Sequence, residues 1–137
     1  MLPTLLVLAS ALIIGALASL HLWFTFVGPK LRPRDEDLEA RMKRTPMRIT
    51  RETTVWRAWI GFNASHSLGG LLFAAVYAYL ALAAPALLFE HVFLPTLGAA
   101  FLGSFVALGR LYWFSVPYRG ILLASACYLA AQLLARA

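Results

Sequence analysis

Two histidines lie inside long stretches without charge, where side chains that can do chemistry are rare. His21 belongs to an uncharged stretch over 1–29, and His66 to a second one over 58–89. His66 belongs to a set of four residues spaced i, i+3, i+4 and i+7, which places them on one face of a helix: Asn63, His66, Ser67 and Gly70. A polar face of this kind inside an apolar helix requires a physical explanation.

These side chains have three possible uses, and the sequence leaves all three open. They could form hydrogen bonds between helices and so fix the register of packing. They could bind a lipophilic ligand, such as a quinone, a sterol-like lipid or an isoprenoid, with Trp59 beside the polar groups. His21 and His66 could also ligate a metal or a b-haem, because histidine is an axial ligand of haem iron and Gly69 or Gly70 would let a flat ring approach. The leading expectation is that no cofactor is bound.

The positions of the two histidines along their helices agree. His21 precedes Lys30 by nine residues, and His66 follows Arg57 by nine residues. At 1.5 Å per residue, each imidazole lies about 13 Å from the nearest base along its helix. If the two helices are antiparallel neighbours, both imidazoles lie at a similar depth.

The composition indicates that these helices lie in a membrane. The 137 residues are 61% hydrophobic and 13% charged, whereas soluble domains have about 45–50% apolar and about 25% charged residues. The uncharged stretches and their prolines predict an all-α, four-helix transmembrane bundle that forms a single integral membrane domain over 1–137. Its transmembrane helices are expected over four ranges: 5–27, 55–84, 95–114 and 119–135.

The distribution of basic residues predicts the orientation. Nine Lys and Arg residues lie between positions 30 and 57, and Arg110 and Arg119 flank the last expected turn, which accounts for eleven of the twelve. By the positive-inside rule the loop over 28–54 is cytoplasmic, and both termini are outside. This placement explains the net charge of +6 without nucleic acid as a partner. Within the loop, a short helix over 34–44 is expected, with Glu39 facing Lys43.

Small residues recur four apart on several of the expected helices. Such spacing allows two helices to approach closely in lipid. The residues expected to pack in this way are Gly15, Gly61, Ser65, Gly69 and Gly103. The packing partner could be another helix of the chain, a second copy of the chain or a larger membrane complex. Membrane lipid is the expected partner of the remaining helix surface.

The segment with the polar face also carries a resemblance. The run W-R-A-W-I-G-F-N-A-S-H-S-L-G over 56–69, with R-I-T-R-E-T-T before it, resembles a family of small uncharacterised bacterial four-helix membrane proteins. The resemblance implies a bacterial inner membrane. The chain has no P-loop, dinucleotide fingerprint or nucleophile elbow. The expected role is that of a membrane-embedded accessory or lipophilic-ligand-binding protein. The alternative is an electron carrier, or an enzyme acting on a lipid or a quinone, that uses His21 and His66.

Overall fold

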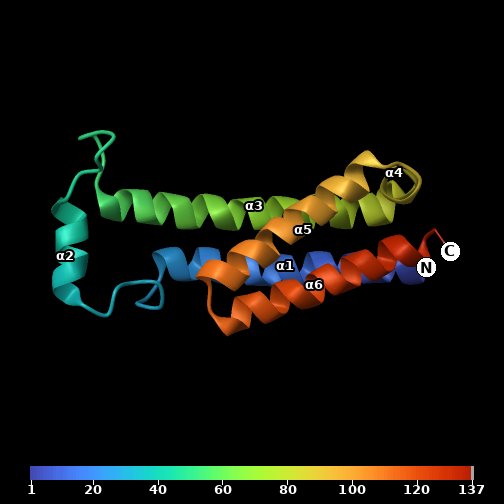
Figure 1. The fold of residues 1–137 in the computed structure, drawn as a ribbon, viewed down its shortest axis with the longest axis horizontal. Coiled ribbons are helices and arrows are strands. Elements are labelled where there is room, and N and C mark those ends of the chain that lie inside the picture. Colours follow the sequence, from blue (N-terminus) through green and yellow to red (C-terminus); the bar gives the residue numbers. More distant parts are fainter. Residues whose placement is uncertain (137) are drawn as a thin grey trace. The chain divides into compact units, whose positions relative to one another are not determined.

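The regular structure of the chain is helical. A computed structural model describes residues 1–136, and the only pairing of extended backbone in them is an isolated bridge between Pro46 and Thr54. The helices are α1 (Leu2–Phe26), α2 (Glu36–Arg44), α3 (Val55–Ala83), α4 (Pro85–Phe89), α5 (Phe93–Tyr112) and α6 (Ser115–Leu134) (Figure 1). The expectation of an all-α protein is confirmed.

Three of these helices are long and apolar enough to cross a membrane. They are α1 with 25 residues, α3 with 29 and α5 with 20. A helix needs about 20 residues to cross about 30 Å of hydrocarbon, so all three meet this length. Helix α6 also has 20 residues but includes Arg119 in its second turn. These lengths and compositions indicate a membrane protein.

Prolines explain where two helix boundaries differ from expectation. The last helix was expected over 119–135, but α6 begins earlier, at Ser115, and includes Pro117 in its first turn. The first turn tolerates proline because its N–H groups lack partners within the helix. The helix expected over 55–84 ends at Ala83, and Pro85 begins the short helix α4, which was not expected.

The chain divides into two compact units. One unit consists of Ala18–Gly69, and the other of Met1–Leu17 together with Gly70–Ala137. Helices α1 and α3 contribute a segment to each unit. We describe the two units separately.

In the unit Ala18–Gly69, α2 runs across the direction of the neighbouring segments of α1 and α3 (Figure 1). Asp35 caps α2 by accepting a hydrogen bond from the N–H of Leu38 at 3.1 Å. Lys43 Nζ lies 2.6 Å from Glu39 Oε1, which confirms the expected pair. The hydroxyl of Thr54 accepts from the N–H of Arg57 at 3.3 Å and so caps the start of α3.

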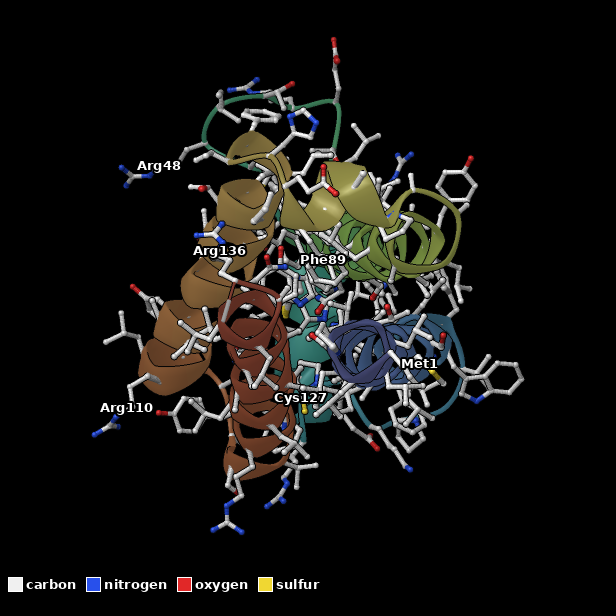
Figure 2. All side chains as sticks on the ribbon, turned by 90° about the vertical axis from the view of Figure 1, so that its right-hand side faces the viewer. Met1, Arg48, Phe89, Arg110, Cys127 and Arg136 are labelled. Atoms are coloured by element: carbon white, nitrogen blue, oxygen red, sulfur yellow. The ribbon has the colours of Figure 1, made fainter. Side chains whose placement is uncertain are left out.

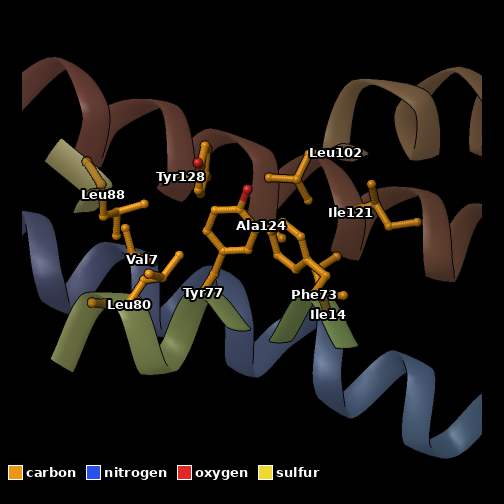
Figure 3. Packing of buried hydrophobic residues seen from close by; sticks show 12 residues of the cluster. Val7, Ile14, Phe73, Tyr77, Leu80, Leu88, Leu102, Ile121, Ala124 and Tyr128 are labelled. Carbon is orange, nitrogen blue, oxygen red and sulfur yellow. The ribbon is translucent and has the colours of Figure 1, made fainter. Parts of the chain in front are cut away.

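The other unit is built around a hydrophobic core that four long helices share. Its buried residues come from α1, α3, α5 and α6, with Leu88 added by α4. Figure 3 shows Phe73 and Tyr77 pointing from α3 into this core, with Tyr128 nearby. Arg110, in contrast, extends away from the unit at the end of α5 (Figure 2).

Two buried tyrosines join three helices in this core. The Tyr77 hydroxyl donates to the carbonyl of Leu94 at 2.7 Å, and the Tyr128 hydroxyl donates to the carbonyl of Pro95 at 3.1 Å. The two rings meet edge to face with centroids 5.5 Å apart, a favourable arrangement for aromatic pairs. Gly98 of α5 lies directly against both phenols. Tyrosine side chains from α3 and α6 therefore hold the N-terminal turn of α5.

The expected small-residue packing occurs at only one of the predicted glycines. A Cβ atom at Gly15 would lie 3.2 Å from Ala74 Cβ, which shows close packing of α1 and α3. At Gly61, Gly69 and Gly103 a Cβ would meet no atom within 4 Å, and Ser65 is exposed. Packing of these three glycines against a second copy or another membrane protein stays a prediction, and large aromatic and aliphatic side chains form the core of the described chain.

Candidate intramembrane binding site

The unit Ala18–Gly69 brings three predicted site residues together. The Nε2 atom of His21 lies 2.9 Å from the Oδ1 atom of Asn63. The ring of His21 also meets the ring of His66 edge to face, with centroids 5.4 Å apart and planes at 72°. All three residues are partly buried. One polar cluster therefore forms from α1 and α3, and we call His21, Asn63 and His66 the histidine cluster.

Backbone contacts hold the histidine cluster in place. The amide nitrogen Nδ2 of Asn63 donates to the carbonyl of Trp59, one turn earlier, at 2.8 Å. The indole N–H of Trp59 donates in turn to the carbonyl of Leu31 at 3.3 Å. Both polar atoms of the Asn63 amide therefore have partners: Nδ2 bonds to the backbone of its own helix, and Oδ1 contacts His21.

Thr25, which the sequence did not single out, forms a hydrogen bond with the backbone of His21. The hydroxyl of Thr25 is buried and donates to the carbonyl of His21 at 2.8 Å. Thr25 follows His21 by one turn, so the same helical spacing that grouped Asn63 with Ser67 could have identified it.

Two other predicted residues are placed differently from the histidine cluster. Ser67 is 1% exposed, and its hydroxyl donates to the carbonyl of Asn63 at 2.9 Å. Its proton is therefore used within α3, a common arrangement for serine inside a helix. Gly70 is buried and belongs to the other unit. Neither residue offers a free donor to a ligand.

Two tryptophans that are near the histidine cluster in the sequence are exposed at the protein surface. Trp23 is 61% exposed and Trp59 is 41% exposed. Further toward the basic loop, Lys30 Nζ lies 4.0 Å from the ring centre of Phe24, and Lys43 Nζ lies 5.2 Å from that of Trp56. Cation–π contacts of this kind join the basic loop to the ends of the two apolar helices.

The donor set of the cluster does not fit a metal or a haem. Within residues 1–136, no group of three or more His, Cys, Asp or Glu side chains could hold a metal ion, and structural zinc requires four ligands. A haem with two axial histidines must lie between the two rings, yet these rings touch edge to face at 5.4 Å. In addition, Asn63 occupies the Nε2 atom of His21. The expected alternative of b-haem ligation by His21 and His66 has no geometric support.

Comparisons with known proteins do not assign this chain to a family. No protein-family model, curated protein or solved structure matches this chain. The resemblance of the segment over 56–69 to small bacterial membrane proteins therefore stays a prediction. The function is inferred from the contacts of the chain's own residues.

Proposed function

We propose that this chain is a small multi-pass membrane protein that binds a lipophilic molecule at the histidine cluster. The observation that carries the proposal is the meeting of His21, Asn63 and His66 in a partly buried position. Polar side chains inside a membrane are costly, and they usually face the protein interior and serve binding or transport. The exposed ring of Trp59, one turn before Asn63 on α3, would face the apolar part of the ligand.

A purely structural role explains the cluster less well. A hydrogen bond between helices in a membrane contributes about 1 kcal/mol or less. The tyrosine contacts and the aromatic core of the other unit already supply extensive packing for α1 and α3. A bond that served packing alone would be expected in that buried core, whereas the histidine cluster is partly open.

The proposal includes a membrane topology. We infer that α6 is a fourth crossing helix and that the loop over 28–54 faces the cytoplasm of a bacterial cell, with both termini outside. Nine basic residues in and beside that loop support this orientation. Arg110 and Arg119, which flank the short connection between α5 and α6, would then lie on the same side.

Cysteine labelling tests the topology. In a Cys127→Ala background, Ile49→Cys is expected to react with a membrane-impermeant maleimide only after the cells are opened. His91→Cys is the matched control, and it is expected to react in intact cells. Both positions are exposed, with Ile49 90% exposed, so accessibility differs only by the side of the membrane. Labelling of Ile49→Cys in intact cells would refute the orientation.

Analysis of co-purified lipid tests the binding function. The protein is extracted in a mild detergent, and the lipids that remain bound are measured by mass spectrometry against those of the whole membrane. We expect one lipophilic species to be enriched with the native protein and lost with Asn63→Leu, because leucine removes both the amide that holds His21 and the polarity of the site. The matched control His91→Leu changes an exposed turn residue and should retain the species.

Two results would contradict the binding function. One is the absence of any enriched species with the native protein. The other is equal enrichment with native protein and with an Asn63→Leu variant whose helicity and unfolding midpoint are unchanged. In the second case the histidine cluster would be a structural contact only.

A further inference from the structure

The connection between α2 and α3 folds back on itself as a short hairpin, which we call the arginine hairpin (45–55). The N–H of Met47 donates to the carbonyl of Thr53 at 3.4 Å. The N–H of Val55 donates to the carbonyl of Thr45 at 2.9 Å. These bonds join the two halves of the connection, so the side chains at its tip have defined positions.

The tip of the arginine hairpin carries two exposed arginines. Arg48 and Arg51 are both exposed, and Arg48 extends away from the backbone of the hairpin (Figure 2). The hydroxyl of Thr50, which lies between them, accepts from the N–H of Glu52 at 3.1 Å. Such a local bond is typical of turns. The two guanidinium groups are therefore presented together on an ordered turn.

Positive charge is concentrated in and beside the arginine hairpin rather than spread evenly over the basic loop. The part over 30–43 carries five basic and four acidic residues. Three ion pairs lie within that part: Arg32 with Glu39, Arg41 with Asp35, and Lys43 with Glu39. The part over 44–57 has one acidic residue, Glu52, and four exposed basic residues: Arg44, Arg48, Arg51 and Arg57. The first part is therefore almost neutral, whereas the second part is strongly basic.

The length of α3 places the arginine hairpin at the surface of the membrane. The hairpin leads directly into Val55, the first residue of α3. The 29 residues of this helix correspond to about 44 Å, and a bilayer with its headgroups is about 40–45 Å thick. The start of α3 therefore lies among the headgroups. Figure 1 shows the hairpin projecting sideways from this point rather than continuing along the helix axis, so its arginines lie beside the headgroup layer.

We propose that the arginine hairpin binds the headgroups of anionic phospholipids, with the guanidinium groups of Arg48 and Arg51 on the lipid phosphates. Arginine suits this role because its planar group can donate two parallel hydrogen bonds to one phosphate. Basic segments next to a membrane helix are also attracted by anionic lipid. This site is separate from the histidine cluster, and it does not depend on the ligand proposed there.

The residue between the two arginines favours a membrane as the partner. Ile49 is 90% exposed. A nucleic acid or an acidic peptide tail offers little apolar surface to this side chain. A membrane offers the boundary between headgroups and acyl chains, where apolar side chains lie beside basic ones. The headgroup layer contains water, so the labelling expected for Ile49→Cys is unaffected.

Native mass spectrometry tests this site with two lipids of equal acyl chains. The full-length protein in a neutral detergent is titrated with phosphatidylglycerol, which is anionic, or with phosphatidylcholine, which has no net charge. We expect the native protein to bind phosphatidylglycerol more tightly. Arg48→Gln/Arg51→Gln should weaken the binding of phosphatidylglycerol about thirtyfold, which corresponds to about 2 kcal/mol for the two arginines together. The binding of phosphatidylcholine should not change.

Arg32→Gln/Arg41→Gln is the matched control. It removes the same charge from the same loop, but these two arginines are paired with Glu39 and Asp35. The control should therefore weaken the binding of phosphatidylglycerol much less than the change at the hairpin. All four arginines are exposed, so circular dichroism should show unchanged helicity in both variants.

Three results would overturn the inference. One is equal binding of the two lipids to the native protein. Another is an equal loss in the two double variants, because binding would then follow the net charge of the loop and not the hairpin. The third is displacement of phosphatidylglycerol by polyglutamate at the same concentration of charge, which would indicate a soluble acidic partner. Asn63→Leu should leave the binding of phosphatidylglycerol unchanged, so the two proposed sites are tested separately.

Discussion

Gly98→Ala is expected to lower the free energy of unfolding by about 1–3 kcal/mol, the usual cost of adding a methyl group to a packed core. The Cβ atom would overlap the phenol rings of both Tyr77 and Tyr128. These rings cannot move aside easily, because each hydroxyl is bonded to a carbonyl of the first turn of α5. Unfolding by sodium dodecyl sulfate in mixed micelles, followed by circular dichroism, measures the loss.

Gly103→Ala is the matched control for this experiment. Gly103 lies on the same helix five residues later, and a Cβ atom there would meet no atom within 4 Å. Both substitutions replace glycine by alanine in a helix interior, so they share the same gain in helix propensity. Gly103→Ala should therefore be neutral or slightly stabilising. If Gly98→Ala were equally harmless, the close approach of the two tyrosines to α5 would be refuted.

The sequence predicted the long helices well, because their signals are local. Long uncharged stretches and the prolines near their ends are visible without any knowledge of packing. The boundaries differ mainly where a proline can either end one helix or begin another. Pro85 does both, and Pro117 lies inside the first turn of α6.

The faces that pack could not be predicted from small residues alone. Glycine and alanine are frequent in apolar helices, so a spacing of four arises on several faces of one helix. The contacting face of α3 carries Phe73 and Tyr77, and α5 accommodates these large rings with Gly98 and Leu102. Complementarity between a large side chain and a gap on the partner helix is a property of the pair, and neither helix reveals it separately.

The histidine cluster was predicted in part. Helical spacing grouped Asn63 with His66, and the distances to Lys30 and Arg57 placed His21 at a similar depth. The sequence could not show that the hydrogen-bond partner of His21 is Asn63. That detail depends on the rotation of α1 about its axis, which only the packed structure defines.

Gln132→Met is expected to raise the free energy of unfolding, in contrast to most substitutions of buried residues. Both Nε2 and Oε1 of Gln132 are buried, and neither has a hydrogen-bond partner within residues 1–136. Leaving a buried polar group unpaired costs about 1–3 kcal/mol. Methionine has a similar length and volume, so it fills the same space without that cost. The same unfolding experiment should show a gain of about that size.

Ser125→Ala is the matched control on the same helix. The hydroxyl of Ser125 donates to the carbonyl of Ile121 at 2.8 Å, so this polar group already has a hydrogen-bond partner. Removing the hydroxyl should change the free energy of unfolding by less than about 0.5 kcal/mol. Ser10 of α1 provides a second test of the principle, because its hydroxyl is also buried without a partner, and Ser10→Ala should be stabilising. If Gln132→Met instead destabilised the protein, its amide would have to bind a water or lipid group in the membrane. The sign of the change therefore distinguishes an unsatisfied amide from a bound one.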